Sequence, residues 1–141
     1  MKSWIWAATM CVTSGGNLTL TALIGIDAED WDHLTYLPNV RTRDAAESDF
    51  RAFDGFEWLS HVLEEYSIPF TSFYTARCFR NLAQQNSLAG EPAVHCHNHI
   101  RPVELSREQF ELELDTMLGL MSEYGVNPKG YRAPCFALSD H

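Results

Sequence analysis

The sequence predicts an α/β fold in which about four parallel strands alternate with helices. The predicted elements follow one another as strand, helix, strand, helix, strand, helix and strand, which is the pattern of right-handed β-α-β units. The first strand, residues 17–26 (NLTLTALIGI), is rich in apolar and β-branched side chains, as expected for a buried strand. Polar clusters follow predicted strands, at the edge of a parallel sheet where ligands bind.

The size and composition of the chain are those of one globular domain. The 141 residues are 45% hydrophobic and 21% charged, with a formal net charge of −9. This acidity argues against a nucleic-acid partner, which requires clustered lysine and arginine. No stretch reaches the roughly 20 apolar residues of a membrane span. The four cysteines lie far apart without a C-x-x-C pair, which indicates neither a disulfide scaffold nor a zinc finger.

Residues 1–16 are predicted to be an N-terminal extension or a weak signal-like segment, and residues 17–141 the domain itself. Lys2 precedes an apolar run from Trp4 to Val12, followed by small residues, as in a signal peptide. The run is short, however, and it lacks a clean A-x-A cleavage site. The sequence therefore leaves both the cytoplasm and the cell envelope open as locations.

A long polar connection is predicted over residues 32–52, followed by a helix. Asp54 is expected to cap this helix with Glu57 three residues later, and Phe53 is expected to pack against Trp58 as a hydrophobic staple. Pro69 ends the helix, and a second strand is predicted over residues 68–75. The expected buried stripe of the helix consists of Phe56, Leu59, Val62, Leu63 and Tyr66.

Two further helices and two further strands complete the predicted order. A weaker helix covers residues 77–85, and a short strand at residues 93–94 leads into a histidine cluster. Ser106 and Gln109 form a capping box at the start of the next helix, and Gly125 is placed to end it. A last strand begins near Gly130. The expected buried stripe of this helix consists of Phe110, Leu114, Met117, Leu118, Met121 and Tyr124.

Residues 95–99 (HCHNH) hold three of the six histidines of the chain. Two imidazoles bind one metal ion only if their ring nitrogens come within about 3 Å of each other. An extended strand would separate His95 from His99 by about 13 Å, whereas a helical turn or tight loop brings such residues together. The spacing therefore predicts a metal-binding turn just after the strand at residues 93–94. The alternative is a polar loop whose histidines are incidental.

Asp27 and Glu29 follow the first predicted strand and, being two residues apart, face the same side of an extended segment. One carboxylate could join His95 and His99 in a two-histidine, one-carboxylate metal site. Zinc fits this ligand set, and other divalent ions remain open. The other carboxylate could take a proton from a water molecule that the metal has made more acidic. The alternative for residues 27–30 alone is a solvated turn.

Three segments in this order resemble motifs of the polysaccharide deacetylases of the NodB-homology type. Residues 26–31 (IDAEDW) resemble the first motif in its D-x-E-D-W form. Residues 95–99 resemble the H-[ST]-x-x-H metal motif, with Cys96 in place of serine or threonine, and residues 131–136 (YRAPCF) resemble the R-x-P motif. The resemblance covers roughly residues 20–138, and the intervening segments 70–74 and 105–110 also resemble the family.

The resemblance implies the N-terminal part of a distorted (β/α) barrel and the metal-dependent hydrolysis of N-acetyl groups on an N-acetylated sugar polymer or oligomer. It implies that Asp27 is the general base and that Arg132 pairs with it and keeps it ionised and oriented. Glu29, His95 and His99 would hold the metal, with zinc as the expected ion. Asp30 is the alternative carboxylate ligand, and Glu29 is favoured because it lies two residues after Asp27.

The same resemblance implies further parts of the site that this sequence does not supply. The family uses later motifs for an apolar acetyl pocket and for a histidine that protonates the leaving amine, and the sequence ends at His141, shortly after Arg132. We therefore expect a partial domain with an unpaired sheet edge, through which chains could associate. The alternatives are a non-catalytic metal- or glycan-binding remnant, or another metal-dependent amidohydrolase on the same scaffold. His97 is expected to point away from the metal.

Overall fold

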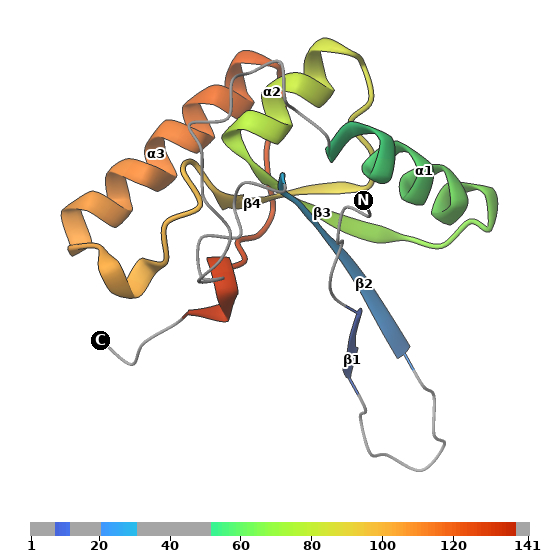
Figure 1. The fold of residues 1–141 in the computed structure, drawn as a ribbon, viewed down its shortest axis with the longest axis horizontal. Helices are drawn as coiled ribbons and strands as arrows, with labels where there is room; N and C mark the ends of the chain where they lie inside the picture. Colours follow the sequence, from blue (N-terminus) through green and yellow to red (C-terminus); the bar gives the residue numbers. More distant parts are fainter. Residues whose placement is uncertain (1–7, 12–20, 31–51, 138–141) are drawn as a thin grey trace, which may run out of the picture.

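The computed structural model describes residues 8–11, 21–30 and 52–137. Within these ranges the strands are β1 (Ala8–Cys11), β2 (Thr21–Ala28), β3 (Phe70–Thr75) and β4 (Glu91–Cys96). The helices are α1 (Ala52–Glu65), α2 (Ala76–Gln84) and α3 (Arg107–Glu123), with two short 3₁₀ helices, η3 (Pro102–Glu104) and η4 (Pro134–Phe136). Figure 1 shows their arrangement. No helix in the described ranges is long and apolar enough to cross a membrane.

The strands form one sheet in the order β1-β2-β3-β4. β2, β3 and β4 are parallel and alternate with helices, which confirms the α/β prediction. The predicted fourth parallel strand is present only as a short extended segment beside β4. There, Val94 N donates to Gly130 O at 2.8 Å and Arg132 N donates to Val94 O at 2.9 Å. The pairing stops because Pro134, which has no N–H group, begins η4.

The prediction did not include β1, which pairs antiparallel with β2. β1 lies inside the segment that was expected to be an N-terminal extension or signal-like. It covers one edge of β2, so that in the described part of the chain the edge strands are β1 and β4, and β4 has on its outer side the bridge of Val94 to Tyr131. The rest of residues 1–16 and the predicted connection up to residue 51 lie outside the described residues.

The N-terminus of α1 differs from the prediction. The helix begins at Ala52, so Asp54 lies in its first turn rather than at the N-cap. The predicted staple is wrong, because Trp58 is 68% exposed. The prediction that Tyr66 belongs to the buried stripe is also wrong, because Tyr66 is 69% exposed and lies beyond the last helical residue. Trp58 follows Phe56 by two positions, about 200° around the helix, which places it on the opposite face. The buried residues are Ala52, Phe56, Ser60 and Leu63.

The other two helices follow their local sequence signals closely. α2 lies within one residue of its predicted bounds. At the start of α3, Gln109 N donates to Ser106 Oγ and Ser106 N donates to Gln109 Oε1, which confirms the capping box. Gly125 follows the C-cap with a left-handed φ of 71°, as predicted. Met117 and Met121 of the predicted stripe are buried together with Leu120, whereas Leu118 and Tyr124 are exposed.

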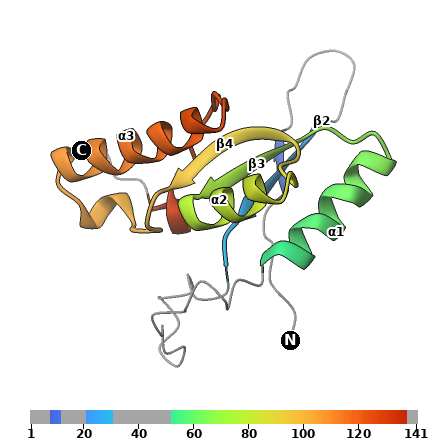
Figure 2. The ribbon, with the colours of Figure 1, turned by 90° about the horizontal axis from the view of Figure 1, so that it is seen from above.

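The helices cover one face of the parallel sheet. The rings of Phe56 on α1 and Phe79 on α2 both contact Tyr74 on β3, at centroid distances of 5.7 and 5.8 Å. Figure 2 shows α2 between α1 and α3, and Figure 1 shows η4 on the other side of the strands. Ile26, Tyr74 and Val94 belong to this core, whereas their strand neighbours Asp27, Phe73 and His95 do not. Because side chains alternate along a strand, these neighbours lie on the opposite face.

Candidate metal centre

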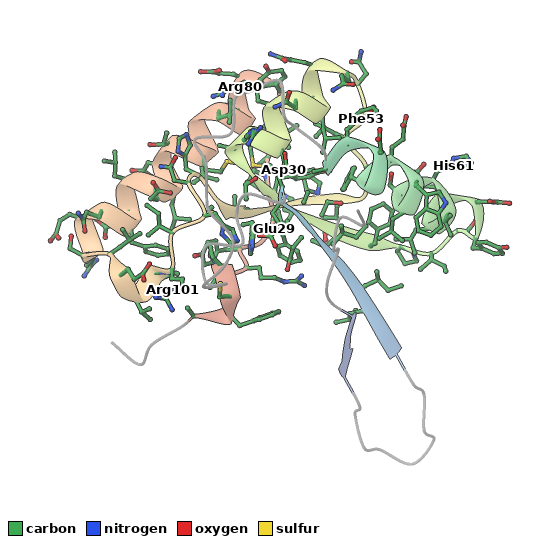
Figure 3. All side chains as sticks on the ribbon, viewed as in Figure 1. Glu29, Asp30, Phe53, His61, Arg80 and Arg101 are labelled. Atoms are coloured by element: carbon green, nitrogen blue, oxygen red, sulfur yellow. The ribbon has the colours of Figure 1, made fainter. Side chains whose placement is uncertain are left out.

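Glu29, His95 and His99 come together beyond the carboxyl ends of β2 and β4. Their ligand atoms all lie within 4.8 Å of one another, so this group could hold a metal ion. Glu29 Oε2 is 2.5 Å from His99 Nε2 and 3.7 Å from His95 Nε2. His95 and His99 are buried, and 20% of the Glu29 side chain is exposed. Figure 3 shows Glu29 and Asp30 where the strand ends meet, and His61 away from them on α1.

The histidine pair is formed by a strand end and a tight turn. β4 continues to Cys96, so His95 lies in the strand and only the residues after it form the predicted turn. The chain then reverses, with His99 in the left-handed region at a φ of 56° and its N–H group 2.7 Å from Cys96 Sγ. The ring centroids of His95 and His99 are consequently 5.1 Å apart. The geometry agrees with the expected turn, but the strand ends at Cys96, so the turn begins two residues later than predicted.

The backbone of Arg132 orients the ring of His95. His95 Nδ1 lies 2.8 Å from the carbonyl oxygen of Arg132. Because a carbonyl oxygen only accepts hydrogen bonds, Nδ1 is the donor of this contact, and Nε2 is the ring nitrogen on the side of Glu29. A histidine that binds a metal typically donates its second ring N–H group in this way. The ring of His95 is therefore held in the orientation that a metal ligand requires, with Nε2 toward Glu29.

The carboxylate of Glu29 is suited to a cation. Burial raises its pKa, but the neighbouring imidazoles of His95 and His99 lower it further, to about 2. Oε2 is buried, and within the described ranges no group donates a well-aligned hydrogen bond to it. A buried anionic oxygen beside two imidazole nitrogens is a donor set for a divalent metal ion, zinc among them.

The structure brings Glu29, and not Asp30, to the two imidazoles. Asp30 is buried and points to α2, where its Oδ2 lies 3.8 Å from Arg77 Nη2. His97 also stays outside the three-residue group. Its carbonyl oxygen accepts a hydrogen bond from Ala76 N at 3.4 Å, which ties the turn to the start of α2.

A second carboxylate, Asp27, precedes Glu29 by two residues at the end of β2, interacts electrostatically with His95 and Glu29, and is held by Arg132. Asp27 Oδ1 is 2.5 Å from Arg132 Nη1, and the two side chains are only 12% and 14% exposed. Burial raises the pKa of Asp27, and the electrostatic interactions of its carboxylate with His95 and Arg132 offset this only in part. The expected pairing is therefore present, but the guanidinium does not lower the pKa of Asp27 below its ordinary value.

Two residues that support Arg132 were not expected from the sequence. The guanidinium lies 3.8 Å from the ring centroid of Phe73, on the face of β3 opposite the core. A Cβ atom added at Gly25 would overlap Arg132 Nη2 and lie 3.0 Å from the Phe73 ring. Gly25 therefore leaves the space on β2 that the guanidinium of Arg132 occupies beside Asp27. The sequence signal was only a glycine within a predicted strand, which indicates close approach of another group.

Comparison with known proteins does not assign a family. No protein-family model and no curated protein matches this chain. The resemblance to the NodB-homology deacetylases, carried by the motifs around Asp27, His95 and Arg132, stays a prediction. The geometry of the metal centre is consequently the basis for proposing a function.

Proposed function

We propose that the protein is a metal-dependent hydrolase that removes N-acetyl groups from an N-acetylated carbohydrate. Glu29, His95 and His99 would hold the metal, with zinc as the expected ion. The observation that carries the proposal is the second carboxylate, Asp27, which is held by Arg132, the residue whose carbonyl oxygen also contacts His95. A site that only stores a metal does not need a second, separately positioned carboxylate.

Asp27 and Arg132 have distinct tasks in this proposal. A divalent metal ion in the site would supply Lewis-acid chemistry, polarising the amide carbonyl and making water more acidic. The carboxylate of Asp27 accepts the proton of the attacking water, and Arg132 keeps that carboxylate in one orientation. Arg132 also holds His95 through its backbone carbonyl group, so one residue supports both halves of the site.

The two faces of the parallel sheet differ in a way that supports the same proposal. The strand order β2-β3-β4 follows the chain, and right-handed crossovers in that order place the connecting helices on one face. The opposite face carries Asp27, Phe73 and His95, at and near the strand ends where (β/α) barrels place their active sites. We therefore infer that the parallel sheet is the first part of a distorted (β/α) barrel of the deacetylase type.

The experiment that tests this proposal measures acetate released from N-acetylglucosamine oligomers. The protein is stripped with a chelator and then assayed without metal, with zinc and with cobalt. We expect acetate only in the two metal-loaded samples. If the loaded protein binds its metal but releases no acetate, the proposal of deacetylation is wrong and the metal has another use.

Replacing Gly25 with alanine should lower the rate of acetate release on the order of 100-fold, because the added Cβ displaces Arg132 from Asp27. The fold should persist, since the overlapping atom is at the end of a flexible side chain. Gly119→Ala on α3 is the matched control, because no atom lies within 4 Å of its added Cβ. Equal activity of the two variants would show that the position of Arg132 does not matter for the reaction.

A further inference from the structure

The turn that carries His99 is attached to α3 by a carboxylate outside the metal group. Asn98 N donates to Glu113 Oε2 at 2.9 Å, and Asn98 Nδ2 donates to Glu113 Oε1 at 2.5 Å. Both oxygens of Glu113 are therefore occupied by one residue of the turn. Glu113 lies in the middle of α3, whose N-terminus is fixed by the capping box of Ser106.

This attachment acts on the strained part of the turn. His99 has a left-handed φ of 56°, which is uncommon for a residue other than glycine and is held only where the surroundings enforce it. Two contacts hold the backbone at this point, one at the N–H group of His99 and one at the N–H group of Asn98. His99 N contacts Cys96 Sγ, and the preceding N–H group, on Asn98, is held by Glu113.

The described contacts give Glu113 no direct part in the donor group. The group that could hold a metal consists of Glu29, His95 and His99, and Glu113 reaches it only through Asn98. His95 is fixed independently, by its strand and by the carbonyl group of Arg132. The placement of His99 opposite Glu29 is therefore the part of the site that depends on the turn.

We propose that Glu113 is a positioning residue of the metal centre, which holds Asn98 and thereby fixes the turn that presents His99 to Glu29. A metal ion then meets a formed site instead of ordering the turn on binding. Residues that orient metal ligands typically change metal affinity by about 10–100-fold when they are replaced. This inference rests on the metal centre within the proposed function, but not on the reaction.

The test is the zinc affinity of Glu113→Gln, measured by competition with a chromophoric chelator. Glutamine keeps the shape of the side chain but places an amide NH₂ group, a donor, against one of the two donors of Asn98. We expect the dissociation constant for zinc to rise about 10-fold. The visible absorption of the cobalt-loaded protein should also change, because it reports the geometry of the ligands. Glu111→Gln, on the same helix and paired with Arg107, should match the unchanged protein in both measurements.

A double-mutant cycle separates positioning from a general loss of stability. If Asn98 and Glu113 act through one contact, Asn98→Ala with Glu113→Gln should weaken zinc binding no more than the stronger single variant does. Fully additive losses, or an unchanged zinc affinity and cobalt spectrum in Glu113→Gln, would overturn the proposal. If Glu113→Gln does not fold, Asn98→Ala alone decides, because it retains the backbone bond and should lose only the side-chain bond. An unchanged zinc affinity in that variant would also overturn the proposal.

Discussion

Replacing His99 with alanine is expected to weaken zinc binding by more than about 100-fold, beyond the range seen when a residue only orients a ligand. His99 Nε2 lies closest to Glu29 Oε2, at 2.5 Å, and its removal leaves a buried carboxylate with one imidazole. His95→Ala should have an effect of the same size, because Nε2 of His95 is the third donor. The measurement is bound zinc per chain after equilibration in a zinc buffer.

His97→Ala is the control for these two variants, since it removes an imidazole from the same segment but not from the donor group. This variant should keep its zinc. If all three variants lose zinc equally, the assignment of His95 and His99, but not His97, as ligands would be wrong.

Replacing Asp27 with asparagine should lower the rate of acetate release by about 10²–10⁴-fold while zinc remains bound. Asparagine has nearly the same shape as aspartate, but it cannot accept a proton from water. It can still accept one hydrogen bond from Arg132, so the arrangement around Phe73 and Gly25 should persist. The two quantities to compare are the rate at saturating substrate and the zinc content of the same preparation.

The Asp27→Asn variant distinguishes two possible roles of Asp27, as general base or as a fourth metal ligand. Loss of zinc together with activity would mean that Asp27 binds the metal. Undiminished acetate release would mean that another group takes the proton, and the role proposed for Asp27 would be wrong.

The parts of the fold that the sequence predicted well are those that depend on local signals. Two examples are the capping box of Ser106 and Gln109 at the start of α3 and the left-handed Gly125 at its end. Both are decided within a few residues of the chain. The three parallel strands were also predicted, because apolar strands alternating with helices allow few topologies.

The errors arose where a distant partner decides the structure. β1 forms because β2 offers it an edge, and no pattern within residues 8–11 distinguishes such a strand from an apolar extension. Trp58 was expected to pack against Phe53 as a hydrophobic staple, but the face of α1 that packs on Tyr74 is the one carrying Phe56, and Trp58 is exposed. Pro134 similarly limits the predicted last strand to a single bridge.

In the candidate site, too, the ligands were predictable from local sequence, whereas the residues that support them through contacts between elements were not. The site residues were predicted from residue type and spacing, except Arg132, which came from the family resemblance. The structure groups Glu29 with His95 and His99 and links Arg132 to Asp27 and to His95. Glu29 was favoured over Asp30 because of its spacing from Asp27, and the structure agrees, since Asp30 points to Arg77. Gly25, Phe73 and Glu113 were missed because they act through contacts between separate elements.

The central claim is that Glu29, His95 and His99 together bind one divalent metal ion, and anomalous diffraction from zinc-soaked crystals tests it most directly. Data collected on both sides of the zinc absorption edge identify the ion without reference to activity. We expect one strong anomalous peak for a zinc ion that lies about 2.0–2.2 Å from a carboxylate oxygen of Glu29 and from Nε2 of both histidines. A peak elsewhere, or none at these three residues in a fully soaked crystal, would contradict it.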